Sequence, residues 1–142
     1  FKAQQMDQFF DFVYSNLILV SVFVVFLVLF IRNEVSRGGQ GITSQKLTEL
    51  MNKEAAVVVD VRDKNEFSQG HIAGAINIPF SDFQTRCSEL TDKTKSVIVA
   101  CKMGQHSGPA GVILRKNGFS SVYRLTGGMS EWRGQNLPVV KK

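Results

Sequence analysis

The residues from Phe12 to Ile31 form a run of twenty positions without a charged side chain, and this run divides the chain into two parts. Nearly all of its side chains are Leu, Ile, Val or Phe. A helix of twenty residues is about 30 Å long, which matches the thickness of a bilayer's hydrocarbon core. A helix that is apolar on every side is not expected as the core helix of so small a protein. The run therefore predicts one transmembrane helix over residues 12–31, after a short tail over residues 1–11.

A secretory signal peptide is the main alternative for this run. Such a peptide has a basic stretch before a shorter apolar run, and a small-residue cleavage site after it. Here two aspartates precede the run, and no cleavage site follows Ile31. Arg32 and Arg37 flank the C-terminal end, so the positive-inside rule places the following domain in the cytoplasm and the N-terminus outside. We therefore expect a single-pass protein that contacts membrane lipid through residues 12–31.

The polar residues 32–41 contain three glycines and predict a flexible linker. The remaining residues, 42–142, are enough for one domain, and the net charge of +5 belongs to this domain. No basic run with interleaved aromatic residues indicates nucleic-acid binding. A disulfide between Cys87 and Cys101 is not expected in a cytoplasmic domain, and the spacing of cysteines and histidines predicts no metal site.

Short apolar runs alternate with helical patterns along this domain. The expected strands cover residues 55–61, 75–78, 97–100 and 122–125, and helices are expected over 43–52, 63–69, 81–90, 107–116 and from 127 onward. This alternation predicts an α/β sandwich around a mainly parallel sheet. Ligands bind such sheets beyond the carboxyl ends of the strands, and Cys101 lies at one of those ends.

The loop that follows this strand carries the expected chemistry. Cys101 is the candidate catalytic nucleophile, because a thiolate beside a helix N-terminus meets unpaired N–H groups and a partial positive charge. Lys102 adds a full charge, and Gly104 allows a tight turn. The loop residues expected to bind substrate are Lys102, Met103, Gly104, Gln105, His106 and Ser107.

Two longer segments around this loop resemble the signatures of the rhodanese family. The first comprises Val59-Asp60-Val61-Arg62, Glu66-Phe67 and Gly70-His71-Ile72-Ala73-Gly74-Ala75-Ile76-Asn77-Ile78-Pro79. The second comprises Gly118-Phe119, Val122, Leu125, Gly127-Gly128 and Trp132. The resemblance covers residues 42–140. The whole layout resembles bacterial single-domain rhodaneses tethered to the inner (cytoplasmic) membrane by an N-terminal helix.

The resemblance implies a three-layer sandwich with a five-stranded, mainly parallel sheet. It also implies a sulfurtransferase that needs no cofactor, in which Cys101 takes sulfane sulfur from a thiosulfate-like anion as a persulfide and passes it to a thiol acceptor. Asp60 and Arg62 are expected to form a supporting network beneath the site, while His71 and Cys87 are expected to be structural.

The phosphatases related to this fold have an arginine at the seventh position of the loop, where this chain has Ser107, so phosphate chemistry is disfavoured. Many active rhodaneses have arginine where this chain has His106, which is only partly charged at neutral pH. A second function therefore stays open: a membrane-tethered adaptor with little or no catalysis, which binds a membrane protein complex such as export or insertion machinery.

Overall fold

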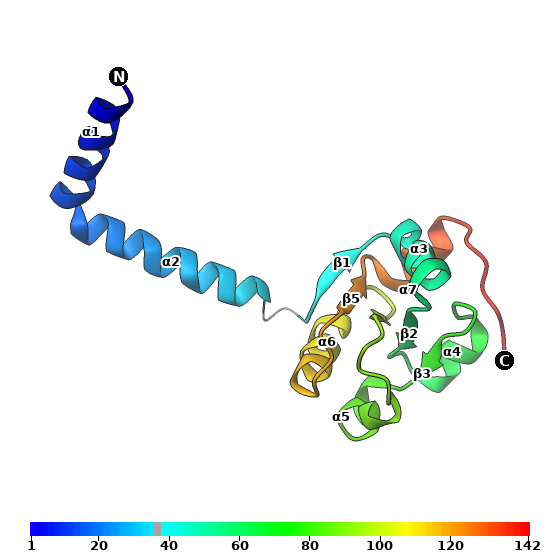
Figure 1. The fold of residues 1–142 in the computed structure, drawn as a ribbon. Coiled ribbons are helices and arrows are strands. Elements are labelled where there is room, and N and C mark those ends of the chain that lie inside the picture. Colours follow the sequence, from blue (N-terminus) through cyan, green and yellow to red (C-terminus); the bar gives the residue numbers. More distant parts are fainter. Residues whose placement is uncertain (36–37) are drawn as a thin grey trace. The chain divides into compact units, whose positions relative to one another are not determined.

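A computed structural model describes residues 1–35 and 38–142, and the chain divides into two compact units over residues 1–35 and 36–142. The first unit consists of helices α1 (Lys2–Ser15) and α2 (Leu17–Val35). The second unit contains the strands β1 (Gln40–Ile42), β2 (Val57–Asp60), β3 (Ile76–Asn77), β4 (Val97–Ala100) and β5 (Val122–Leu125). Its α-helices are α3 (Ser44–Glu54), α4 (Lys64–Gln69), α5 (Phe83–Arg86), α6 (Ser107–Lys116) and α7 (Gly128–Gly134) (Figure 1).

The first unit differs from the single helix expected over residues 12–31, because the helix is interrupted at Asn16. The Asn16 side-chain amide donates to the Phe12 carbonyl at 2.9 Å, and the Asn16 backbone leaves the helical conformation with φ −125° and ψ 36°. Asparagine side chains compete for backbone groups in this way and favour helix ends. Among the described residues, no single helix has the length and hydropathy of a membrane span. The pair Lys2–Ser15 and Leu17–Asn33, bent by 89°, meets those requirements only jointly.

The second unit is built on a five-stranded sheet with the order β1-β5-β4-β2-β3, in which every neighbouring pair is parallel. This confirms the expected parallel α/β sheet and the number of strands that the family resemblance implied. Buried Val and Ile side chains make up most of β2 and β4, as is typical of strands covered on both faces. Because all strands point the same way, their carboxyl ends meet at one edge of the sheet.

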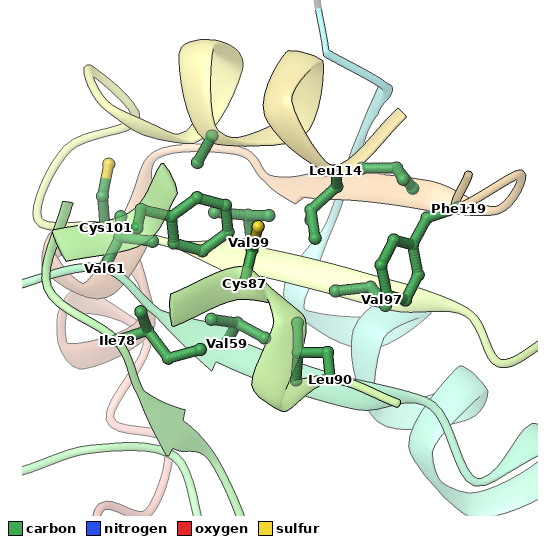
Figure 2. Close-up of a cluster of buried hydrophobic side chains, with 13 residues drawn as sticks. Val59, Val61, Ile78, Cys87, Leu90, Val97, Val99, Cys101, Leu114 and Phe119 are labelled. Atoms are coloured by element: carbon green, nitrogen blue, oxygen red, sulfur yellow. The ribbon is translucent and has the colours of Figure 1, made fainter. Parts of the chain in front are cut away.

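Helices cover both faces of this sheet and complete the three layers. On one face, α5 and α6 contribute Phe83 and Leu114 to a core cluster that also contains Val59 and Val99 of the sheet (Figure 2). On the other face, the buried side chains of α3 and α7 pack with those of β2, β4 and β5. These apolar layers bury the sheet, so the polar edge at the carboxyl ends of the strands is the place for a ligand.

Two expected segments differ from the structure. The linker expected over residues 32–41 is helical through Val35, and the chain forms β1 from Gln40 onward; Ser36 and Arg37 lie outside the described residues. The helix expected over residues 81–90 is three short pieces, the 3-10 turns Phe80–Asp82 and Cys87–Glu89 on either side of α5. The Thr85 hydroxyl donates to the carbonyl of Asp82, three residues earlier, and such bonds compete with a regular helix.

The segment that enters the second unit packs directly on α6. Gly38 is buried, has φ +73°, and a Cβ atom there would collide with the carbonyl oxygen of Gly108. In turn, a Cβ at Gly111 would collide with the carbonyl oxygen of Gly38. Arg124 fixes the next residue, because its Nε donates to the Gly39 carbonyl at 2.9 Å. The two backbones can approach this closely only because glycines face each other.

Candidate active site

Cys101 directly follows β4, and its sulfur is enclosed by the loop that leads into α6. The backbone N–H of Gly104 donates to the Cys101 Sγ atom at 2.7 Å. Gly104 has φ +100°, a conformation that other residues rarely adopt, so this turn requires glycine. The Ser107 hydroxyl donates to the Gly104 carbonyl at 2.9 Å and fixes the turn from the helix side. The loop therefore positions an N–H donor against the sulfur atom.

The two cysteines of the chain have different surroundings (Figure 2). The Cys87 sulfur lies among the side chains of the core cluster and donates to the Gln84 carbonyl at 3.5 Å. The Cys101 side chain starts from the edge of the same cluster, and its sulfur points away from it toward the loop. This arrangement confirms Cys87 as a packing residue. It also leaves the Cys101 sulfur directed at the carboxyl edge of the sheet.

Helix α7 holds the loop in place through its own first backbone groups. The N–H of Met129 donates to the Cys101 carbonyl at 2.8 Å, and the N–H of Ser130 donates to the Lys102 carbonyl at 2.9 Å. Gly128 has φ +60°, and a Cβ atom there would collide with both of these carbonyl oxygens. Gly128 of the C-terminal signature is therefore required by the approach of α7 to the backbone of Cys101 and Lys102.

A hollow of about 330 Å³ opens around Cys101, and we call it the cysteine hollow. Its walls combine basic, acidic and aromatic side chains from the ends of β2, β3 and β4: Val61, Arg62, Asp63, Glu66, Phe80, Ser81, Cys101, Lys102, Gln105 and His106. The Lys102 Nζ atom lies 3.5 Å from the Glu66 Oε1 atom; the Lys102 side chain is exposed and that of Glu66 is partly exposed. Such an exposed ion pair is weak and leaves the lysine free to turn toward an anion.

The residues expected to bind substrate fall into three groups. Lys102, Gln105 and His106 line the cysteine hollow together with Cys101. Gly104 and Ser107 shape the loop, and the Ser107 side chain is itself buried. Met103 is 60% exposed and does not line this hollow.

An aromatic residue that the sequence analysis did not single out supports His106. The rings of Phe80 and His106 are stacked, with centroids 4.6 Å apart and planes inclined by 8°. Phe80 packs against the core cluster on its other side. Phe80 follows the short strand β3 and therefore lies at the carboxyl edge of the sheet. This position after a strand was the sequence signal that could have identified it.

Asp60 and Arg62 form a buried hydrogen-bonded network, and Arg62 also lines the cysteine hollow. The Arg62 guanidinium donates to both carboxylate oxygens of Asp60, at 2.6 Å from Nη2 to Oδ2 and 3.0 Å from Nε to Oδ1. Both side chains are buried, and Arg62 Nη2 also donates to the Gly70 carbonyl at 2.9 Å. Asn77 closes the network by donating to the carbonyls of Asp60 and Arg62. The pair fixes the turn between β2 and α4.

His71 has the structural place that was expected for it. Its ring nitrogen Nδ1 lies 2.7 Å from the Phe67 carbonyl, and its ring stacks on that of Phe67 at 3.7 Å. Its backbone exchanges two hydrogen bonds of 2.9 Å with Val140. His71 therefore ties the C-terminal segment to the end of α4 and does not line the cysteine hollow.

Comparisons with known proteins agree with this arrangement. The profile of the rhodanese-like domain matches residues 43–135. An uncharacterized protein of Bacillus subtilis, YqhL, is 38% identical over 124 residues, which are 85% of this chain and 95% of that protein. The thiosulfate sulfurtransferase GlpE of Pseudomonas fluorescens is 40% identical over 88 residues, 60% of this chain and 77% of that enzyme.

Among solved structures, the crystal structure of a rhodanese-related protein from Thermoplasma volcanium superimposes with a TM-score of 0.65 and 30% identity. It covers 72% of this chain and 99% of that one. The profile match over residues 43–135 contains β2 to β5, the cysteine loop and the Gly127-Gly128 turn described above. The chain therefore belongs to the rhodanese-like domain family.

Proposed function

We propose that this protein is a sulfurtransferase that moves sulfane sulfur from a thiosulfate-like donor to a thiol acceptor through a persulfide on Cys101. The observation that carries the proposal is the Cys101 sulfur held by the Gly104 N–H at 2.7 Å, in a hollow that Lys102 and His106 also line. The family and the name of the related thiosulfate sulfurtransferase support the same reaction class.

The proposed reaction has two balanced steps. The Cys101 thiolate attacks the outer sulfur of thiosulfate, a new S–S bond forms at Sγ, and the donor's own S–S bond breaks as its electron pair leaves with sulfite. The persulfide anion takes up a proton from solvent, and an acceptor thiolate then attacks its terminal sulfur. The acceptor leaves as a persulfide, and the electron pair of the broken bond restores the Cys101 thiolate. No oxidant or reductant is needed.

The charges around the sulfur suit an anionic donor. Lys102 and the protonated form of His106 supply positive charge at the wall of the cysteine hollow. The ten-residue helix α6 begins at Ser107 and adds the partial positive charge of its N-terminus. The Gly104 N–H, which donates to the Cys101 sulfur in the free protein, would also stabilise the negative sulfur of the persulfide.

Mass spectrometry of the intact protein after incubation with thiosulfate tests this function. We expect a mass increase of one sulfur atom on Cys101, removed by cyanide as thiocyanate. Cys87→Ser is the matched control and should gain the same mass, because Cys87 is buried in the core. Cys101→Ser should gain none. If the wild-type protein shows neither the adduct nor thiocyanate, the transferase is excluded and the adaptor function is favoured.

We also propose that the first unit holds the domain at the inner (cytoplasmic) membrane, with lipid around its apolar residues and the domain on the cytoplasmic side, where Arg32 follows the apolar run. Nearly all large apolar side chains from Leu17 to Ile31 are exposed. The Ser21 hydroxyl donates to the Leu17 carbonyl at 2.7 Å, so this polar group is satisfied within its own helix, as lipid requires.

Fractionation of cells tests this location. Wild-type protein should remain with membranes after washing in alkaline carbonate, and a protease added to intact spheroplasts should leave the domain uncut. Phe23→Asp combined with Leu27→Asp should release the protein to the supernatant, because charges in α2 oppose insertion. Gln4→Asp combined with Gln8→Asp adds the same charge to α1 as a control. Equal release of both variants, or of neither, would contradict the proposal.

A further inference from the structure

A second hollow lies beside the cysteine hollow and shares a wall with it. It has a volume of about 80 Å³, and we call it the arginine hollow after Arg133. Arg62, Glu66 and Lys102 line both hollows, whereas Ser130 and Arg133 of α7 line only this one. The two hollows are therefore separated by the weak Lys102–Glu66 ion pair.

The arginine hollow has an excess of positive charge. Asp60 offsets the charge of Arg62, and Glu66 offsets that of Lys102. Among the residues that the structure describes, no carboxylate lies within 4.0 Å of the Arg133 guanidinium. Within the described part of the chain, Arg133 donates only to a neutral group, the Gly70 carbonyl, at 3.2 Å from Nη2. Its remaining N–H donors are free for an anion, and a guanidinium matches a carboxylate in shape.

Backbone contacts fix the arginine hollow relative to the nucleophile. The Ser130 N–H donates to the Lys102 carbonyl, and this bond holds α7 in a fixed position against the loop that carries Cys101. The Gly70 carbonyl accepts from both Arg62 and Arg133, which ties α7 to the buried ion pair. Gly70 also provides the space, because a Cβ atom there would lie 2.9 Å from Arg133 Nη2.

The sizes of the two hollows suit different ligands, the donor in the first and part of the acceptor in the second. A thiosulfate ion is small enough to be held entirely within the 330 Å³ of the cysteine hollow. A ligand with its sulfur at Cys101 has to extend past Lys102 and Glu66, which line both hollows, in order to contact Arg133. The 80 Å³ of the arginine hollow are enough for a small planar group such as a carboxylate and not for a bulky one.

We propose that the arginine hollow is a subsite for the carboxylate of the acceptor, so that the preferred acceptors are low-molecular-weight thiols that carry a carboxylate. This inference rests on the proposed sulfur transfer. The acceptor's thiolate attacks the terminal sulfur of the Cys101 persulfide, while its carboxylate accepts hydrogen bonds from the Arg133 guanidinium and the Ser130 hydroxyl. The carboxylate takes no part in bond making; it holds the thiolate in position.

The test compares two acceptors of equal chain length, 3-mercaptopropionate and its neutral amide. The full-length protein in detergent is loaded with thiosulfate, excess donor is removed, and the decay of the Cys101 persulfide is followed against acceptor concentration. Arg133→Gln should lower the second-order rate constant for the carboxylate about tenfold, as expected for loss of one charge-assisted hydrogen bond, and that for the amide less than twofold. Comparing variants with the same thiol cancels differences in thiol reactivity.

Matched variants keep the result independent of folding. Lys116→Gln removes an exposed charge from the end of α6 and should change neither rate constant. Arg133→Lys keeps the charge and should retain part of the preference for the carboxylate. Salt at 0.5 M should reduce the preference in the wild type, because it screens exposed charges.

Each possible outcome decides the inference. An equal fall for both thiols in Arg133→Gln would make Arg133 a purely structural residue and overturn the subsite, while the sulfur transfer itself stands. Unchanged rate constants for both thiols would overturn it as well. If thiosulfate forms no persulfide on Cys101 at all, the proposed function fails, and this inference fails with it.

Discussion

The imidazole ring of His106 lies flat on the ring of Phe80, with 4.6 Å between the ring centroids. The stack holds the imidazole at the wall of the cysteine hollow, where a thiosulfate-like anion would enter. A protonated imidazole on an aromatic face is favoured by the ring's quadrupole. The chain thus has an imidazole where many rhodaneses have a guanidinium, and exchanging the two groups should reveal what the ring contributes to donor binding.

His106→Arg should strengthen donor binding in the first step. Arginine carries a permanent charge on a planar group with several N–H donors, which matches an oxyanion better than an imidazole does. We expect KM for thiosulfate at pH 7.5 to fall about threefold in the variant. Alkylation of Cys101 by iodoacetamide at the same pH separates a change in thiol reactivity from donor binding. An unchanged KM would contradict the role of His106.

Phe80→Leu should weaken donor binding through His106 alone. Leucine keeps the apolar contact with the core but removes the aromatic face, so the imidazole loses its support. We expect KM for thiosulfate at pH 6 to rise about threefold in the wild-type background, equivalent to about 0.7 kcal/mol. In a His106→Ala background the same substitution should have no effect. Additive effects in this double-mutant cycle would show that the two rings act independently.

Asp60→Asn should destabilise the domain strongly. The substitution leaves the Arg62 guanidinium buried without its anionic partner, which typically costs about 3–5 kcal/mol. Urea denaturation of the full-length protein in detergent, followed by the fluorescence of Trp132, measures the free energy of unfolding. The control is Asp63→Asn, because Asp63 is exposed and should change stability by less than about 0.5 kcal/mol. Similar values for the two variants would mean that the ion pair contributes little.

Gly128→Ala should displace the cysteine loop. An alanine at φ +60° is strained, and its Cβ atom would collide with the Cys101 and Lys102 carbonyls. We expect a loss of more than tenfold in persulfide formation and of about 1–3 kcal/mol in stability. Gly134→Ala is the control, since a Cβ atom there meets nothing within 4 Å. The idea would be contradicted by wild-type activity in Gly128→Ala.

The ionised Asp92 carboxylate should stabilise the fold, and this contribution should be lost at strongly acidic pH. The hydroxyl and the backbone N–H of Thr94 donate to Asp92 Oδ1 and hold the pKa of this carboxyl below its usual value of 3.8. Because the pKa is lowered on folding, the stabilisation is present above the ordinary pKa and is lost as the pH falls through the lowered one. Asp92→Asn should therefore be less stable than wild type at pH 6, by a margin that shrinks toward pH 3. A margin independent of pH would exclude the charge as its cause.

The elements that sequence patterns predicted well are those whose signal is local. Continuous apolar runs such as Val57–Asp60 and Val97–Ala100 showed strands buried on both faces, and the turn after Ala100 showed where a ligand would bind. Strand β1 was not predicted, because only one of its three residues is apolar and the segment becomes a strand by pairing with β5, which is distant in the chain. The interruption at Asn16 was also missed, since one polar residue hardly changes the hydropathy of a long apolar run.

The same division holds for the candidate site. Cys101, Lys102 and His106 were predicted because they follow one another in a loop at a strand end. Phe80 and Arg133 were not, because they reach the two hollows only when β3 and α7 pack beside that loop. Their side-chain types carry no motif by themselves. Residues that only tertiary packing brings together can be identified from the structure but not from the sequence.

The packing of Gly38 on α6 sets the smallest piece of this chain that should fold as a domain. The family profile begins at residue 43, and the sequence pattern placed the start at residue 42. A truncation there would remove β1 and the bond from Arg124 to Gly39, and it would uncover the glycine face of the helix that follows the Cys101 loop. Expression of the isolated domain should therefore start no later than Gly38.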